Sequence, residues 1–136
     1  MSFETDTTTF KLRYIQDDQY FTGDGPILFC TGSQGDVWKY YRNSGFMTET
    51  VAKNLSALVI FAEHRYFGES HPFEKDIMLK EGYNNYLTIE NVLADYVMVV
   101  NKVKSTFGKD LNVAAFGGSY GGMLAAYARM KYPHVF

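Results

Sequence analysis

The sequence predicts an α/β fold in which a mostly parallel sheet carries helices on both faces. Three short apolar runs, residues 26–30, 57–62 and 111–116, have the composition of strands that are buried on both sides. Segments with helical spacing of their apolar residues separate these runs, and strands that alternate with helices generally pair in parallel. Each apolar run is also followed by a loop rich in glycine or charge.

The other elements follow from periodicity and from turn residues. Residues 9–16 alternate as a strand does and end at an Asp-Asp turn. Residues 46–55 place their apolar side chains on one helical face. A longer helix is predicted over 88–107, where helical spacing continues until a glycine ends it. The last helix, over 118–131, begins in a glycine-rich turn and ends before a proline.

Composition favours one globular domain and excludes several classes of protein. The chain has 136 residues, 46% of them apolar and 21% charged. A net charge of −2 gives no basic excess for binding nucleic acid. The longest nearly apolar run, residues 55–62, is too short to span a bilayer, so no membrane is expected. The one cysteine, Cys30, forms no disulfide within the chain and supports no multi-cysteine metal site, and neither a metal nor a cofactor is expected.

The loops after the three apolar runs are expected to form the functional site. They are residues 32–36, 63–68 and 117–121. The carboxyl ends of parallel strands meet at one edge of a sheet, and ligands bind there in open α/β folds.

The third of these loops matches the nucleophile elbow Gly-x-Ser-x-Gly, with Ser119 at its centre. In this motif a strained strand-to-helix turn presents the serine hydroxyl to solvent. Gly117 and Gly121 would stand where strand and helix pass closest, because a side chain would collide there. Only about 0.05 such matches are expected by chance in a chain of this composition. Ser119 is therefore the predicted nucleophile.

A catalytic triad cannot be completed from this chain in the usual order of serine, acid and histidine. No Asp or Glu follows Ser119, and His134 would lie at the far end of the helix that Ser119 begins, about 20 Å away. His64 belongs to the charged cluster Glu63-His64-Arg65, which we expect to brace the loops. His71 is expected on a surface loop.

Five further side chains could have either a structural or a functional role. Asp95 is expected on the solvated edge of its helix, and Cys30 is expected as a packed thiol. The aromatic residues after the first glycine loop are candidates for a pocket lining, although most aromatic residues serve the core. They are Trp38, Tyr40 and Tyr41.

Three segments together resemble one family of serine peptidases, the lysosomal Pro-X carboxypeptidases and the dipeptidyl peptidases II. The segments are Phe-Cys-Thr-Gly-Ser-Gln-Gly-Asp at 29–36, Phe-Ala-Glu-His-Arg-Tyr-Phe-Gly-Glu-Ser at 61–70, and Gly-Gly-Ser-Tyr-Gly-Gly-Met-Leu-Ala-Ala at 117–126. The resemblance runs from about residue 10 to residue 136. In the family the first loop usually reads Gly-Asn-Glu-Gly-Asp, whereas this chain has Ser33 and Gln34 in place of Asn-Glu.

The resemblance implies an α/β-hydrolase fold and the cleavage of peptides next to proline through an acyl-enzyme on Ser119. Residues 1–136 would be the amino-terminal part of the catalytic domain. The carboxyl-terminal strands, an inserted helical domain, and the Asp and His of the triad would lie outside it. The sheet would then have one open, apolar edge. A lysosomal or secreted location is also implied, and the Asn54-Leu55-Ser56 sequon is compatible with it, although the first residues show no signal peptide.

Three functional hypotheses remain open at this point. In the first, Ser119 is acylated while the backbone N–H groups of Tyr120 and Ser33 hold the oxyanion. In the second, the chain is a catalytically inert remnant or an interaction module. In the third it is an esterase or lipase, which shares the elbow but does not predict residues 63–70. The choice between carboxypeptidase and dipeptidyl peptidase action and the oligomeric state are not predicted.

Overall fold

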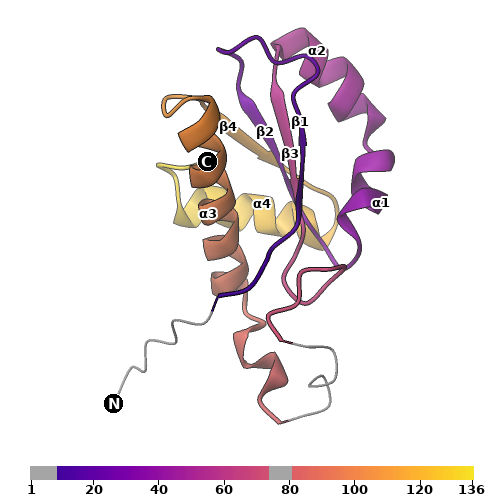
Figure 1. Ribbon diagram of the computed structural model, residues 1–136, viewed down its shortest axis with the longest axis vertical. Helices are drawn as coiled ribbons and strands as arrows, with labels where there is room; N and C mark the ends of the chain where they lie inside the picture. Colours follow the sequence, from indigo (N-terminus) through magenta and orange to yellow (C-terminus); the bar gives the residue numbers. More distant parts are fainter. Residues whose placement is uncertain (1–8, 74–80) are drawn as a thin grey trace.

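A sheet with the strand order β1-β3-β2-β4 forms the centre of the molecule (Figure 1). The computed structural model describes residues 9–73 and 81–136. The strands are β1 (Tyr14–Asp17), β2 (Ile27–Thr31), β3 (Leu58–Ala62) and β4 (Val113–Phe116). β2 pairs in parallel with both β3 and β4, while β1 lies antiparallel to β3. The predicted mixed α/β fold with a mostly parallel sheet is therefore confirmed.

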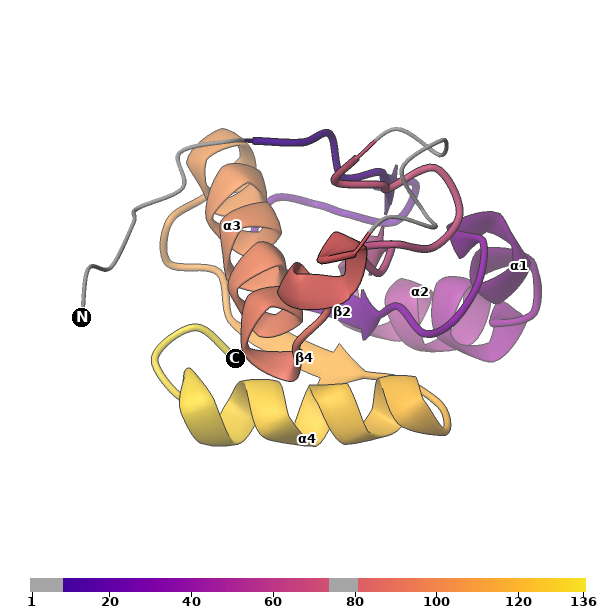
Figure 2. The same ribbon diagram turned by 90° about the horizontal axis from the view of Figure 1, so that it is seen from below.

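Helices cover both faces of this sheet (Figure 2). They are α1 (Val37–Arg42), the π-helix η1 (Phe46–Val51), α2 (Ala52–Leu55), the 3-10 helix η3 (Tyr83–Tyr86), α3 (Ile89–Phe107) and α4 (Tyr120–Lys131). Phe29 and Ile60 pack with residues of α3 and α4. Leu28 and Phe61, their neighbours along the strands, point to the other face and pack with residues of α1 and α2.

The buried strands were predicted correctly for β2 and β3, in which every residue is buried. The prediction of a fully buried third strand was wrong, because β4 is only partly buried. Within the described residues β4 has a neighbouring strand on one side only, which leaves its other edge exposed.

The strand expected over 9–16 is limited to β1. Arg13, just before β1, forms backbone hydrogen bonds with the loop after β3. The Arg13 N–H donates to Ser70 Oγ at 2.8 Å, and the Arg13 carbonyl accepts from the Glu63 N–H at 3.0 Å. The same segment therefore reaches the loop that follows β3. The expectation that no signal peptide is present concerns residues 1–8, which lie outside the described ones.

The two longer helices end where expected, and they begin one residue (α3) and two residues (α4) later than expected. Thr88 caps α3 by accepting from the Asn91 N–H, and Gly108 follows the last helical residue. The helix expected over 46–55 is present, although its first part is a π-helix. The short helix α1 was missed; its signal was Asp36, whose side chain accepts from the Trp38 N–H as an N-cap. None of the helices in the described ranges combines the length and apolar character that a bilayer crossing requires.

Candidate active site

The loops that follow β2, β3 and β4 meet at one end of the sheet, as predicted. Thr31, the last residue of β2, joins two of them through its hydroxyl, because Oγ1 lies 2.6 Å from the Gly121 carbonyl oxygen and 3.1 Å from that of Phe116. Sequence reasoning missed this contact, although Thr31 is the first polar residue after the apolar run. Thr31 therefore fixes the turn between β4 and α4 against the end of β2.

Ser119 occupies the sharp turn between β4 and α4. Its backbone has φ 53° and ψ −127°, a region that non-glycine residues rarely occupy. The residue is exposed, and its side chain makes no capping hydrogen bond to α4. The turn therefore has the strained backbone and the solvent-facing serine that the elbow motif predicts.

The two motif glycines are required by the close approach of strand and helix. A Cβ on Gly117 would lie 2.6 Å from Thr31 Oγ1, and one on Gly121 would lie 2.7 Å from Thr31 O. Contacts under 3.0 Å are essentially never made by real Cβ atoms. Gly118, which is not a fixed position of the motif, has no atom within 4 Å of such a Cβ. The steric reason given for the two glycines is thus confirmed.

Two backbone N–H groups of these loops donate to no acceptor among the described residues. Tyr120 is the first residue of α4, where helix N–H groups have no intrahelical acceptor. The Ser33 N–H has no acceptor among the described residues, and Ser33 itself is buried. A Cβ on Gly121 would lie 3.5 Å from Ser33 Cβ, so the two loops abut. N–H donors beside a nucleophile stabilise a negative oxygen that develops there.

His64 is fully engaged in the structure. Its Nδ1 lies 2.6 Å from the carbonyl oxygen of Arg65, which can only accept, so Nδ1 carries the proton. Nε2 lies 3.0 Å from the Tyr120 hydroxyl and accepts from it. Burial lowers the pKa of His64, which favours the neutral ring. His64 therefore links the loop after β3 to the first turn of α4, as the bracing prediction requires.

Glu63 is a buried carboxylate around which the loops are assembled. It accepts hydrogen bonds from Arg13 Nη2 at 2.7 Å, the Val37 N–H at 3.0 Å, the Glu69 N–H at 3.0 Å and Ser70 Oγ at 2.8 Å. Burial raises the pKa of Glu63, but these hydrogen bonds outweigh it and the net shift is downward. A Cβ on Gly68 would lie 1.8 Å from Glu63 Oε1, so glycine is needed at that position.

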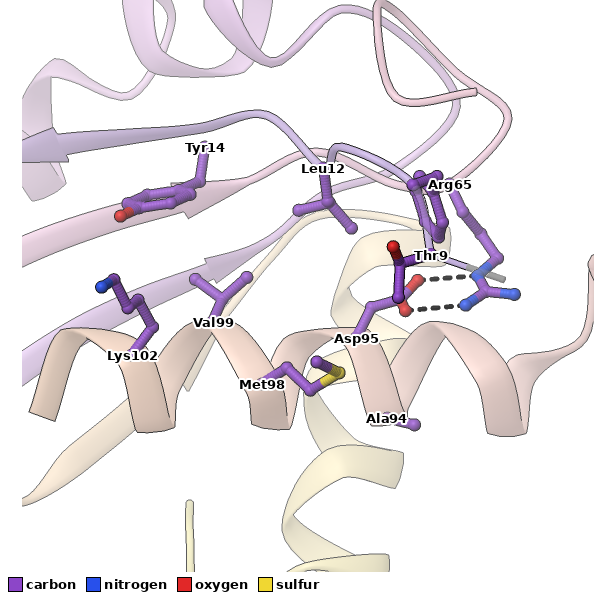
Figure 3. A pocket seen from close by; sticks show the side chains of 10 residues that line it. Thr9, Leu12, Tyr14, Arg65, Ala94, Asp95, Met98, Val99 and Lys102 are labelled. Carbon is purple, nitrogen blue, oxygen red and sulfur yellow. Dashed lines mark hydrogen bonds and ion pairs between the residues drawn. The ribbon is translucent and has the colours of Figure 1, made fainter. Parts of the chain in front are cut away.

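Asp95 is not on a solvated edge, and that prediction was wrong. Arg65 holds it through two hydrogen bonds, of 2.6 Å from Nε and 2.7 Å from Nη2, and the two side chains are only 10% and 12% exposed. The pair closes one end of a groove of about 400 Å³ between α3 and the segment before β1. Figure 3 shows Met98 and Val99 along its length and Lys102 with Tyr14 at its other end.

The other two histidines make no hydrogen bond with Ser119 among the described residues. His71 contacts the Gly68 carbonyl oxygen through Nε2 at 3.0 Å, and His134 follows α4, where its ring contacts Tyr132. Among the described residues, no group of three or more His, Cys, Asp and Glu side chains could hold a metal ion.

Of the aromatic residues after the glycine loop, Tyr40 lines a cavity of about 520 Å³ together with Phe116, Gly117 and Gly118. Trp38 and Tyr41 do not line it and pack against each other instead, with ring centroids 5.9 Å apart. Cys30 also borders this cavity but is buried, and burial raises the pKa of its thiol to about 12. The expectation of a packed thiol is confirmed.

Comparison with known proteins assigns the family. Residues 3–136 match the family described as Serine carboxypeptidase S28. This chain belongs to that family. The predicted resemblance is thereby confirmed, and the observed sheet is compatible with an α/β-hydrolase-like fold.

The relatives of this S28 family member are much longer than the chain itself. The lysosomal Pro-X carboxypeptidase of Bos taurus is 47% identical over 130 residues, which is 93% of this chain and 26% of the relative. The protein of the same name from Homo sapiens is 46% identical over the same length. Prolyl carboxy peptidase like protein 5 of Caenorhabditis elegans is 40% identical over 134 residues, again 26% of its length. The chain therefore spans about a quarter of these relatives.

Proposed function

We propose that residues 1–136 supply the nucleophile and the oxyanion-binding N–H groups of a serine peptidase that hydrolyses peptide bonds next to proline. The observation that carries the proposal is the strained turn at Ser119, between a parallel strand and the start of a helix. The names of the bovine and human relatives support a peptide substrate with proline beside the scissile bond. The catalytic domain would be of the α/β-hydrolase kind, with further strands and an inserted helical domain beyond this portion.

In the proposed reaction, Ser119 Oγ attacks the carbonyl carbon of the scissile bond and loses its proton to a histidine base. The carbonyl oxygen becomes negative and accepts hydrogen bonds from the Tyr120 and Ser33 N–H groups. Collapse of this intermediate breaks the C–N bond, and the amine leaves with the proton from the histidine. Water then gives a proton to the histidine and attacks the acyl ester on Ser119. The acid is released as the bond to Ser119 Oγ breaks and Oγ takes the proton back from the histidine.

We do not assign that base to His64, because its Nε2 accepts from the Tyr120 hydroxyl and not from Ser119. Both of its ring nitrogens are engaged, one with the Arg65 carbonyl and the other with the Tyr120 hydroxyl. The base and its acid would come from outside these 136 residues. We therefore expect the chain by itself to be inert, which was the second of the three hypotheses.

The location proposed for the protein is lysosomal or extracellular. The word lysosomal in the names of the bovine and human relatives supports this. Asn54, the acceptor of the sequon, is exposed and therefore accessible to glycosylation.

A chimera tests the function directly. This chain would replace the matching segment of the bovine relative, which supplies the rest of the polypeptide. We expect the chimera to hydrolyse a peptide with an internal proline and Ser119→Ala to abolish turnover, whereas Ser105→Ala, an exposed serine of α3, leaves it unchanged.

Three results would contradict the proposal. Undiminished turnover in a correctly folded Ser119→Ala chimera would remove Ser119 as the nucleophile. Cleavage of simple esters without cleavage of the peptide would favour the esterase reading. Turnover by the 136-residue chain alone, lost on Ser119→Ala, would refute its inertness.

A further inference from the structure

The hydroxyl of Tyr96 reaches from α3 into the loop that follows β2. It donates a hydrogen bond to the Gly32 carbonyl oxygen at 3.0 Å. The side chain is completely buried, and its ring packs edge-on against Phe29 with centroids 5.5 Å apart. Burial raises the pKa of Tyr96 well above its ordinary value, so the hydroxyl keeps its proton and remains a donor. A phenylalanine would pack equally well here, so packing alone does not explain the hydroxyl.

The acceptor of this bond belongs to the same peptide group as the Ser33 N–H. A trans peptide is planar, and its carbonyl and its N–H point in opposite directions. By holding the Gly32 carbonyl towards α3, Tyr96 turns the Ser33 N–H away from α3. A Cβ on Gly32 would lie 2.3 Å from Ala62 O, so this position requires glycine. Glycine leaves the peptide free to rotate unless another group fixes it.

The other end of the loop is fixed separately. The Val37 N–H donates to Glu63 at 3.0 Å, and Asp36 pairs with Arg13 at 2.9 Å. Neither contact reaches the peptide between Gly32 and Ser33. In the described part of the chain, the Gly32 carbonyl accepts from Tyr96 alone.

We propose that Tyr96 is a positioning residue for the oxyanion site and that its hydroxyl sets the direction of the Ser33 N–H. Tyr96 does not touch the substrate and acts through the peptide between Gly32 and Ser33. The proposal rests on the proposed function in one respect, which is that the Ser33 N–H binds the oxyanion.

The sequence allows the orientation of this peptide to be observed selectively. Glycine precedes serine at only two places, Gly32-Ser33 and Gly118-Ser119. A chain labelled with carbonyl-13C glycine and 15N serine therefore gives two carbonyl-to-amide NMR correlations, one from each loop. Tyr96→Phe removes the hydroxyl and keeps the ring. We expect it to move the Ser33 correlation and to leave the Ser119 correlation in place.

A matched control is Tyr66→Phe. Tyr66 is also buried, and its hydroxyl donates to the Tyr83 carbonyl oxygen at 2.7 Å, outside the loop after β2. This variant should move neither correlation. A Ser33 correlation that stays unchanged in Tyr96→Phe would overturn the proposal, and so would an equal movement in Tyr66→Phe.

Kinetics of the chimera described above test the consequence for catalysis. Removal of one oxyanion donor typically lowers kcat by about 100-fold or more, so misdirection of one donor should lower it roughly tenfold. We expect this loss in kcat with little change in KM for Tyr96→Phe. The activity control is Tyr20→Phe, which should lose none, because the Tyr20 hydroxyl donates to Glu49 at 2.8 Å outside the three loops of the site. An unchanged kcat beside a shifted Ser33 correlation would overturn the role in the oxyanion site. Failure of the proposed function would appear differently, as full activity in Ser119→Ala, and the NMR result would still decide whether Tyr96 orients the peptide.

Discussion

The Tyr120 hydroxyl and His64 Nε2 are joined by a hydrogen bond of 3.0 Å, although the two residues are 56 positions apart in the chain. Tyr120 directly follows Ser119, and His64 is 1% exposed. Because His64 Nδ1 donates to the Arg65 carbonyl, Nε2 is the acceptor nitrogen, and within residues 9–73 and 81–136 its donor is the Tyr120 hydroxyl alone. The elbow is therefore connected through one side chain to the loop after β3.

Loss of this hydroxyl should destabilise the protein. We expect Tyr120→Phe to lower the free energy of unfolding by about 1–3 kcal/mol, because it leaves His64 Nε2 buried without a partner. Urea denaturation followed by circular dichroism measures the change. Tyr127→Phe is a suitable control, since Tyr127 is on the same helix and its hydroxyl makes no hydrogen bond with the described residues. Equal stability of the two variants would contradict the role assigned to the bond.

Stability should also fall in mild acid because of His64. Burial holds its pKa in the folded protein below the ordinary value near 6.5, so the unfolded chain binds more protons between the two values. The contribution is complete above about pH 6.5 and is lost as the pH falls through the folded pKa. In His64→Gln a non-titrating oxygen replaces Nε2 as the acceptor. The free energy of unfolding measured from pH 7 to pH 5 should decrease more steeply in the wild type than in this variant.

Alanine substitution should lower the free energy of unfolding strongly at Gly117 and hardly at all at Gly118, the two glycines before Ser119. Gly117→Ala places a methyl group 2.6 Å from Thr31 Oγ1 and 2.7 Å from the backbone of Gly121, which should cost about 2 kcal/mol or more. Gly118→Ala places its methyl group in open space and should change stability by no more than about 0.5 kcal/mol. The midpoints of thermal unfolding of the two variants can be compared directly, and similar values would contradict the steric account.

The strain at Ser119 should be measurable as stability. Its φ of 53° with ψ of −127° costs a side-chain-bearing residue about 1–3 kcal/mol, while glycine adopts it freely. Glycine loses about 0.5–1 kcal/mol more than alanine in backbone entropy on folding. We expect Ser119→Gly to be more stable than Ser119→Ala by about 1 kcal/mol. Urea denaturation of the two variants tests this, and a more stable alanine variant would show that the turn is not strained.

The ion pair between Arg65 and Asp95 should contribute more than a surface pair does. The side chains are 10% and 12% exposed, so Asp95→Ala leaves a largely buried guanidinium without its carboxylate and should cost about 3 kcal/mol. Asp110→Ala removes an exposed carboxylate from a loop and serves as the control. A loss below about 1 kcal/mol for Asp95→Ala would place this pair among ordinary surface pairs.

Most of the elements and the strained turn at Ser119 could be predicted from the amino-acid sequence. Apolar runs predicted β2 and β3, helical spacing predicted α3, and Gly-x-Ser-x-Gly predicted the turn at Ser119. These features are local, because each depends on residues only a few positions apart. The partial burial of β4 was not predicted from its apolar run, since an apolar run does not reveal how many strands flank it.

Which side chains meet at the site depends on the tertiary structure and could not be predicted from the sequence. Asp95 was predicted to be solvated because the spacing of apolar residues shows only which face of its own helix is buried. The spacing does not show its partner Arg65, which is 30 positions away in the chain. The ring of Tyr96 lies in the core, while its hydroxyl reaches Gly32 across 64 positions. A hydrogen bond depends on where two folded segments approach within about 3 Å. That approach is set by the packing of α3 against the sheet, which no local pattern in the sequence records.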